Sequence, residues 1–366
     1  MDQTAIREIA NKFCIRGEYQ DFKQNTAGLI NKTCIVCSKE GDKVYHYVLQ
    51  TVNTSVFTHP KELIRNISSV TDYLREKIKQ SGGDASRETL CLVPTHDGAL
   101  YYVDPDGKFW RMYNYIEGAR TYDSVENDEM FYHCGKGFGH FQRLLSDYPA
   151  DTLYPTIPRF HDTPNRFCDF KRAIEENRAG RAAQVAEEIA GYLAHADLCD
   201  CVTKYIENGE VPVRVTHNDT KLNNIMIDCH SGQAICVIDL DTVMPGSALY
   251  DFGDAIRYGA NNAAEDEKDL SKVYLRKDLF RAFTKGFLEE ASASLTEREL
   301  ALIPESAVLM TLECGMRFLG DYLNGDVYFG IRYPEHNLDR ARTQLKLVND
   351  MLANLDEMHA IVDSYR

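Results

Sequence analysis

Four polar side chains with chemically useful spacing lie in one short segment, residues 213–240. Asp219, Lys221 and Asn224 follow one β-branched run, and Asp239 ends the next. A carboxylate such as Asp219 can orient a hydroxyl and accept its proton, and an ammonium such as Lys221 can offset charge on a phosphoryl group. Amide and carboxylate oxygens, as in Asn224 and Asp239, are ligands that Mg²⁺ prefers. The segment therefore has the groups that phosphoryl transfer requires.

The spacing of these groups adds to the argument. The order His-x-Asp-x-Lys-x-x-Asn from His217, followed by Ile-Asp fifteen residues after Asn224, matches the kinase catalytic loop and its metal-binding aspartate. A polar β-turn would have to contain all five residues in register by chance. We expect His217 to be structural, because it precedes the base by two residues. Asp241 is expected to share the strand face of Asp239 and to bind a second metal, bind the substrate or cap a turn.

The hydrophobic periodicity of the flanking regions predicts an α+β fold with two lobes. Residues 1–115 form the predicted N-terminal nucleotide-binding lobe, and residues 116–366 form the catalytic and substrate-binding lobe, which is mainly helical. Strands are predicted at 29–38, 43–52, 89–94, 99–103 and 108–116. Helices are predicted at 61–80, 127–145, 169–177, 182–205, 277–291, 297–323 and 339–364.

Composition excludes several classes of protein. The net charge of −15 argues against a nucleic-acid partner, which would require a basic patch. No apolar run is long enough to span a membrane, and the first residues have no apolar signal core, so we expect a cytoplasmic protein. The eleven cysteines are an odd number, and reduced, structural thiols are the simplest interpretation.

Several segments resemble the aminoglycoside phosphotransferase and choline-kinase-like family, and within it the bacterial N-acetylhexosamine 1-kinases. They include VTHNDTKLNN, IDLDTVMPGS, DFGDAIRYGA and ECGMRFLGDYL. Gly246, followed five residues later by Asp251, matches a family motif in which the aspartate structurally steadies the catalytic loop. The resemblance implies a bilobal protein-kinase-like fold, ATP and Mg²⁺ as cofactors, and phosphorylation of the anomeric hydroxyl of an N-acetylhexosamine.

The same resemblance implies roles for individual residues. Asp219 would be the base or the residue that positions the sugar hydroxyl, and Asn224 and Asp239 would hold Mg²⁺. Arg317 and Tyr328 match sugar-binding positions, and Thr242 is a weaker candidate for substrate binding. Without the resemblance, Arg317 would equally fit an ion-pair ladder on a solvated helix face.

The nucleotide site departs from the kinase pattern. The expected phosphate loop, residues 25–32, has a single glycine, Gly28, with Asn31 and Lys32 beside it. The strand lysine that contacts the α- and β-phosphates is replaced by Gln50, which donates hydrogen bonds but has no charge. Lys32 is a candidate to compensate. Residues 110–117 resemble a hinge that binds adenine, with Tyr113 and Tyr115 as possible side-chain contacts or as members of an alternating strand.

Two other functions are compatible with parts of this pattern. A kinase of choline or an aminoglycoside would use the same loop, but its cationic substrate would favour clustered carboxylates and aromatics over an arginine. An inactive pseudokinase would be expected to lack the base or a metal ligand, whereas Asp219, Asn224 and Asp239 are all present. The sequence leaves the preferred sugar and the oligomeric state open.

Overall fold

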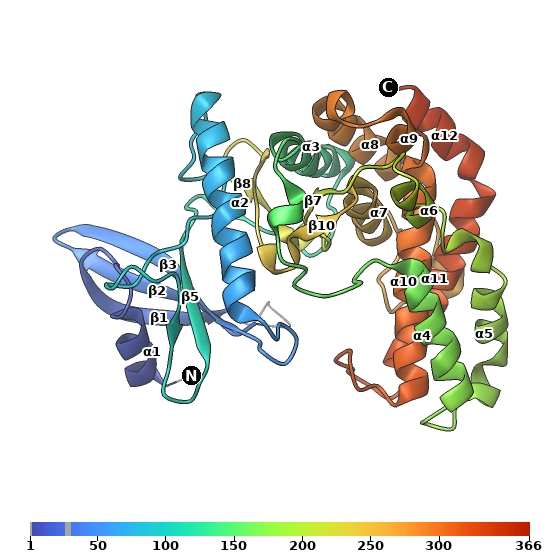
Figure 1. Cartoon of the computed structure of the whole chain (residues 1–366), viewed down its shortest axis with the longest axis horizontal. Coiled ribbons are helices and arrows are strands. Elements are labelled where there is room, and N and C mark those ends of the chain that lie inside the picture. Colours follow the sequence, from blue (N-terminus) through green and yellow to red (C-terminus); the bar gives the residue numbers. More distant parts are fainter. Residues whose placement is uncertain (1, 26–30) are drawn as a thin grey trace.

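The computed structural model describes residues 2–25 and 31–366. Figure 1 shows an N-terminal sheet with helix α1 beside it, the long helix α2 next to the sheet, and a larger helical part. The strands are β1 (Glu18–Asn25), β2 (Thr33–Glu40), β3 (Lys43–Val52), β4 (Tyr102–Val103), β5 (Phe109–Asn114), β6 (Ala119–Arg120), β7 (Arg214–Thr216), β8 (Ile225–Asp228), β9 (Ala234–Val237) and β10 (Met244–Gly246). The α-helices are α1 (Gln3–Ala10), α2 (Pro60–Gln80), α3 (Asp128–Leu144), α4 (Thr163–Glu176), α5 (Ala186–Leu193), α6 (Thr203–Glu207), α7 (Ala248–Gly259), α8 (Lys277–Ala291), α9 (Glu297–Ala301), α10 (Ile303–Asn324), α11 (His336–Ala353) and α12 (Leu355–Asp363).

The N-terminal sheet is antiparallel, with strand order β1-β2-β3-β5-β4. The predicted hairpin at Glu40-Gly41-Asp42 is present, and Gly41 has a φ of 60°, which suits glycine at a tight turn. The edge strand β1 was not predicted, because most of its side chains are exposed and polar. The predicted strand at 89–94 is wrong: this segment makes isolated backbone hydrogen bonds to β5 and ends at Pro94, which has no N–H to donate.

Helix α2 buries the apolar side chains of one face. It begins with Pro60, and proline suits the first turn of a helix because a backbone N–H at that position would have no partner within the helix. It belongs to the larger of two hydrophobic cores, which continues through the helical part of the chain. The smaller core joins α1 to the sheet. The buried amide of Asn66 fixes α2 to the rest of the molecule, since its Nδ2 donates to the carbonyl oxygens of Tyr154 (2.7 Å) and Val243 (3.1 Å).

Three long helices predicted in the second part of the chain are interrupted. The 182–205 pattern is divided into α5, α6 and short 3₁₀ turns, where Asp197 and Asp200 favour turns over helix. The 297–323 pattern begins at a capping box of Thr296 and Glu299 and breaks at Leu302, because Pro304 lies in the first turn of a new helix, α10. The 339–364 pattern breaks at Asn354.

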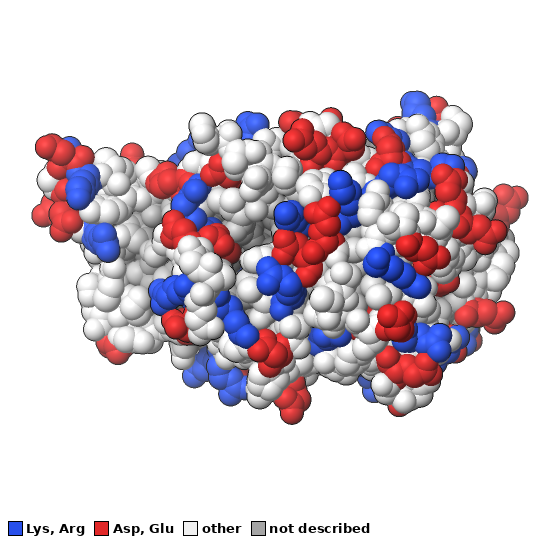
Figure 2. Space-filling model, turned by 90° about the horizontal axis from the view of Figure 1, so that it is seen from above, with Lys and Arg blue, Asp and Glu red and all other residues white. Residues whose placement is uncertain are grey.

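The polar loop predicted to carry the chemistry lies between small strands of the larger part. Strand β7 pairs with β10, and β6, β8 and β9 form a separate antiparallel sheet. All eleven cysteines are free thiols. Within the described residues, each helix is too short or too polar to cross a membrane. On the face drawn in Figure 2, acidic and basic side chains are interspersed.

Candidate active site

The buried carboxylate of Asp251 holds the backbone of the loop after β7. Asp251, in the first turn of α7, accepts the backbone N–H groups of His217 (2.9 Å) and Asn218 (2.7 Å) and the side-chain amide of Gln142 (2.6 Å). Burial raises the pKa of Asp251, although His217 and these hydrogen bonds act in the opposite direction. Two successive N–H groups held by one side chain fix the backbone that leads into Asp219.

His217 connects this loop to the segment between β9 and Asp239. Its Nε2 lies 2.8 Å from the carbonyl oxygen of Ile238, and its Nδ1 accepts the N–H of Asp219 at 3.2 Å. The hydroxyl of Thr242 donates to the carbonyl oxygen of His217 (2.7 Å). Thr242, expected to bind substrate, is buried and uses its only proton inside the protein.

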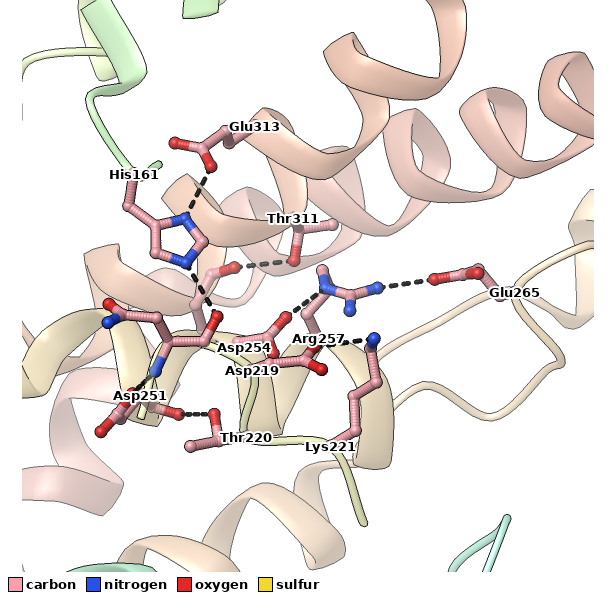
Figure 3. Close-up of polar contacts among 12 residues, drawn as sticks. His161, Asp219, Thr220, Lys221, Asp251, Asp254, Arg257, Glu265, Thr311 and Glu313 are labelled. Atoms are coloured by element: carbon pink, nitrogen blue, oxygen red, sulfur yellow. Dashed lines mark hydrogen bonds and ion pairs between the residues drawn. The ribbon is translucent and has the colours of Figure 1, made fainter. Parts of the chain in front are cut away.

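Asp219 and Lys221 form an ion pair at the entrance of the loop, with 2.7 Å between Nζ and Oδ1 (Figure 3). Their side chains are 27% and 34% exposed, so both remain accessible to a ligand. Burial alone would raise the pKa of Asp219, but Lys221 outweighs it and the net shift is downward. Asp219 is therefore an anion that suits positioning a hydroxyl better than removing its proton early in the reaction.

Asn224 and Asp239 come together across the β8–β9 hairpin, because the N–H of Ile238 donates to the carbonyl oxygen of Asn224 (2.9 Å). The Nδ2 of Asn224 donates to the backbone oxygen of Asp219 (2.8 Å) and to its Oδ2 (3.1 Å). This arrangement leaves the amide oxygen of Asn224 as a candidate metal ligand. Asp239 has a φ of 59°, in the left-handed region that aspartate tolerates better than most residues.

Electrostatics at Asp239 also fit a divalent cation. Its side chain is exposed, yet the surrounding protein raises the pKa of its carboxyl to about 6, first by restricting solvation and then through the negative charges of Asp241 and Asp219. No cluster of three or more His, Cys, Asp or Glu with metal-site geometry occurs in the described part of the chain. One amide and one carboxylate are nevertheless sufficient for Mg²⁺, which commonly completes its shell with water and phosphate oxygens.

Asp241 does not share the exposure of Asp239, contrary to the prediction of a common strand face. The chain turns into a 3₁₀ segment, Leu240–Thr242, directly after Asp239, so strand alternation stops there. The Asp241 side chain is 5% exposed and its Oδ1 lies 2.5 Å from Nη1 of Arg111, which is 1% exposed. Its Oδ2 accepts the side-chain amide of Asn31 (2.7 Å). Both Asp241 oxygens are thus taken by the N-terminal part of the chain.

Arg111 is a residue of this site that the sequence analysis missed. It lies directly across from Gln50 in the β3–β5 pair, and Gln50 Oε1 accepts from its Nε (3.3 Å) and Nη2 (3.0 Å). The other end of the Gln50 amide donates to Thr33 (2.9 Å). A charged residue inside the apolar segment FWRMYN was the available signal.

The other residues predicted to bind the nucleotide differ in their exposure. Gly28 lies outside the described residues. Lys32 is exposed, and its backbone pairs with Thr51. Tyr113 is 4% exposed and its ring lies 5.3 Å from the Arg111 guanidinium, whereas Tyr115 is half-buried against His46. Of the two hinge tyrosines, Tyr115 has the more accessible side chain.

Arg317 lies on α10 within a group of aromatic rings. Its guanidinium is 5.2 Å from the ring of Phe160, 5.4 Å from Phe329 and 5.9 Å from Tyr328, which is 60% exposed. It forms no ion pair with a described residue, so the predicted ion-pair ladder is not present. Arg166 lies close enough for the two positive charges to interact, since burial and then Arg317 lower the pKa of Arg166.

A buried ion pair links α10, the helix that contains Arg317, to the catalytic loop. Glu313, one turn earlier on α10, lies 2.8 Å from Nδ1 of His161, and Nε2 of His161 lies 3.1 Å from the carbonyl oxygen of Asn218 (Figure 3). Both partners are acceptors, so only the doubly protonated imidazolium can donate to each. Burial lowers the pKa of His161, but Glu313 outweighs it and the net pKa is raised. His161 follows Phe160, so the segment that contacts Arg317 also contacts Asn218, the residue before Asp219.

Several solved structures have a similar fold. The structure is similar to a choline kinase from Cryptosporidium parvum Iowa II (TM-score 0.61, 13% identity, covering 100% of this chain and 99% of the other). It is also similar to a microcompartment-associated aminopropanol kinase (TM-score 0.59, 14% identity, 97% and 98% coverage). A spectinomycin phosphotransferase solved with ADP and spectinomycin gives a TM-score of 0.55 at 12% identity, with 98% and 99% coverage.

These likenesses establish a protein-kinase-like fold and, at such low identity, the fold alone. The family is established separately, by a match of residues 21–284 to the sequence model of the phosphotransferase enzyme family. The matched region contains the loop with Asp219 and Lys221 and both candidate metal ligands. The chain therefore belongs to the phosphotransferase enzyme family.

Proposed function

We propose that this protein is an ATP- and Mg²⁺-dependent kinase that phosphorylates the anomeric hydroxyl of an N-acetylhexosamine to give the sugar 1-phosphate. The family supports phosphoryl transfer, and the partly exposed pair of Asp219 and Lys221 supports an alcohol as the acceptor. The sugar is proposed from the surroundings of Arg317 and from the sequence resemblance described above.

In this proposal Asp219 accepts a hydrogen bond from the sugar hydroxyl and aims its oxygen at the γ-phosphorus of ATP. The proton passes to Asp219 as the oxygen–phosphorus bond forms and the bond to ADP breaks. Lys221 lies beside Asp219 and offsets charge on the transferring group. Asn224 and Asp239 would hold Mg²⁺, which supplies charge neutralisation at the β- and γ-phosphate oxygens.

The observation that carries the choice of substrate is the condition of Arg317. It is half-buried, and because no described residue forms an ion pair with it, its guanidinium donors are available to a ligand. Sugar hydroxyl and acetamido oxygens accept such donors, and the exposed ring of Tyr328 offers an apolar face. Arg166 adds a second positive charge nearby. Two guanidiniums would repel a quaternary ammonium or an aminoglycoside.

A kinase of choline or an aminoglycoside is the second candidate. Several similar structures are named as kinases of this kind, and the net charge of −15 would attract a cationic substrate. Two carboxylates on α10 lie four residues from Arg317, and both are buried. Glu313 is already paired with His161 and Thr163, and Asp321 accepts backbone N–H groups of residues 327–329. Both are therefore poor partners for a substrate ammonium.

Coupled ADP release across an alcohol panel tests the choice directly. The panel comprises N-acetylglucosamine, N-acetylgalactosamine, glucose, galactose, choline and kanamycin, each with Mg²⁺ and ATP. We expect strong turnover only with the N-acetylated sugars, and ³¹P NMR should locate the product phosphate on the anomeric carbon. Turnover of choline or kanamycin, or phosphate at another hydroxyl, would reject the proposed substrate.

Replacing Arg317 tests the observation behind the choice. Arg317→Met keeps much of the side-chain length and its aromatic contacts but removes the donors. We expect KM for the sugar to rise by about 10- to 100-fold, the range for losing a hydrogen bond to a charged group, while KM for ATP is unchanged. An unchanged KM for the sugar would remove Arg317 from the substrate site.

A further inference from the structure

Helix α10 has a buried carboxylate four residues before Arg317 and another four residues after it, so the three side chains lie along one face of the helix. The first, Glu313, is held by His161 and Thr163. The second, Asp321, forms no ion pair with a described residue, and it lies near the C-terminus of the helix, where the helix dipole disfavours a negative charge. A buried carboxylate in such a place must accept hydrogen bonds to be tolerated.

The loop between α10 and α11 supplies those hydrogen bonds. Oδ1 of Asp321 accepts the backbone N–H groups of Val327 (3.0 Å) and Tyr328 (2.9 Å). Oδ2 accepts the backbone N–H of Phe329 (2.9 Å) and the side-chain amide of Asn337 (3.0 Å). All four partners are donors, which suits an ionised carboxylate because it can only accept. One buried side chain therefore holds three successive peptide groups of the loop.

The chain reverses direction at the end of α10 to reach this carboxylate. Gly325 and Asp326 have φ angles of 96° and 61°, and the N–H of Asp326 donates to the backbone oxygen of Asp321 (2.8 Å). Figure 1 shows the following segment as a loop that projects from this end of the helix. The side chains of Val327 and Tyr328 are 79% and 60% exposed. The backbone of the loop is thus fixed from inside the protein, while these two side chains remain accessible.

Aromatic contacts place the same loop beside Arg317. The half-buried ring of Phe329 lies 4.7 Å from the ring of Phe318 on α10 and 5.4 Å from the Arg317 guanidinium. The ring of Tyr328 lies 4.8 Å from Phe329 and 5.9 Å from the same guanidinium. Phe329 therefore packs against the helix, and the exposed Tyr328 lies next to the arginine that we propose binds the substrate.

We propose that Asp321 is a positioning residue for recognition of the acceptor alcohol. By holding the backbone of residues 327–329, it keeps Tyr328 beside Arg317 before the substrate binds. This inference rests on the proposed function, because it concerns the substrate site of the same kinase. Asp321 acts through the loop and does not touch the substrate. A loop ordered in advance spares the substrate the cost of ordering it, so its loss should raise KM for the alcohol and leave kcat at saturation unchanged.

Hydrogen–deuterium exchange resolved to single residues tests the hold on the loop without any substrate. In the unmodified protein, the amides of residues 327–329 should exchange at least about tenfold more slowly than those of Gly330 and Ile331, whose N–H groups donate to no described residue. Asp321→Asn keeps the size of the side chain but turns one acceptor into a donor. At least one of the three amides should then lose this protection.

Steady-state kinetics test the link to recognition, with the alcohol that the panel identifies as the best substrate. Asp321→Asn should raise KM for that alcohol by about 10- to 100-fold, because only the fraction of molecules with an ordered loop is competent to bind, while kcat and KM for ATP stay within about threefold. Asp326→Asn is the matched control. The Asp326 side chain is 3% exposed and contacts Arg181 (2.6 Å) and the same Asn337 amide (2.9 Å), but it accepts none of the N–H groups of residues 327–329. It should leave KM within about threefold.

The outcomes separate the possible explanations. Fast exchange at 327–329 in the unmodified protein, or unchanged exchange in Asp321→Asn, would overturn the proposal. An unchanged KM despite faster exchange would also overturn it, as would an equal rise in KM in the control. If Asp321→Asn does not fold, Tyr328→Ala decides, because it alters an exposed side chain and should raise the same KM. Silence on the whole panel would reject the proposed function and the role in recognition, whereas turnover of a different alcohol would reject only the proposed substrate.

Discussion

Replacement of Asp219 by asparagine would test the central chemical assignment. The substitution keeps the shape of the side chain and its ability to accept a hydrogen bond, but it removes the charge and the capacity to accept a proton. The neighbouring Lys221 loses its ion-pair partner at 2.7 Å. If Asp219 contributes through proton transfer and charge, the effect should appear in kcat and much less in KM for ATP.

The expected magnitude follows from the environment of the carboxylate. General-base catalysis contributes about 10²- to 10⁴-fold in rate, and a base with a lowered pKa should fall in the lower half of that range. We therefore expect kcat to fall by about 10²- to 10³-fold, or about 3–4 kcal/mol in the barrier. Because both side chains of the pair are partly exposed, the free energy of unfolding should change by no more than about 1 kcal/mol.

The assay is ADP release at saturating sugar and ATP, with urea denaturation of the same samples. Asp147→Asn is the control, because it removes another aspartate–lysine pair (Lys77, 2.6 Å) at an exposed position away from the loop. The control should leave kcat unchanged. A kcat for Asp219→Asn within tenfold of the unmodified protein would refute the role of Asp219, and a large loss of stability would refute the argument from exposure.

Three further perturbations follow from the structure. Gln50→Lys should lower the free energy of unfolding by about 2–3 kcal/mol in urea titrations, because a second cation faces Arg111, whereas Gln50→Glu should not. Gly246→Ala should lower it by about 1–3 kcal/mol, because the added Cβ overlaps the Thr216 hydroxyl and lies 2.9 Å from the Asn218 side-chain oxygen, and a smaller effect would show that β10 shifts easily. His161 has a raised pKa in the folded state, so its protonated form stabilises the fold below about pH 6.5, the value for the unfolded chain, and this contribution is lost as pH rises through the folded-state pKa. The stability difference between the unmodified protein and His161→Gln should therefore be larger at pH 6 than at pH 9, and a constant difference would contradict a charged His161.

The catalytic loop was accessible from sequence because its information is local. Asp219, Lys221 and Asn224 lie within six residues, and a hairpin of β-branched strands returns Asp239 to the same place. Spacing along the chain therefore translates directly into spatial proximity. Helices α2, α3 and α8 were similarly predictable, since each has a continuous apolar face and a defined start or end.

The role of Arg111 depends on contacts that are distant in sequence. Gln50 and Arg111 are 61 residues apart, and only the β3–β5 register shows that they face each other. The environment of Asp241 was mispredicted for a local reason. The alternation of a strand was extended past Asp239, where the backbone turns. His161 was also missed: its partners, Glu313 and Asn218, are 152 and 57 residues away.

The division of the buried apolar side chains into two hydrophobic cores determines which parts of the molecule unfold locally. Helix α2 shares its core with the helical part, and Val52 of β3 and Tyr113 of β5 pack into the same core, while other side chains of the sheet and α1 form the smaller core. A smaller core supports a less stable cooperative unit, so amide hydrogens in β1 to β3 should exchange through partial unfolding that leaves α3 and α8 intact. Because Arg111 of β5 and Asn31, which precedes β2, both contact Asp241 outside the sheet, a nucleotide bound between these segments would slow exchange in the sheet before it affected the helices.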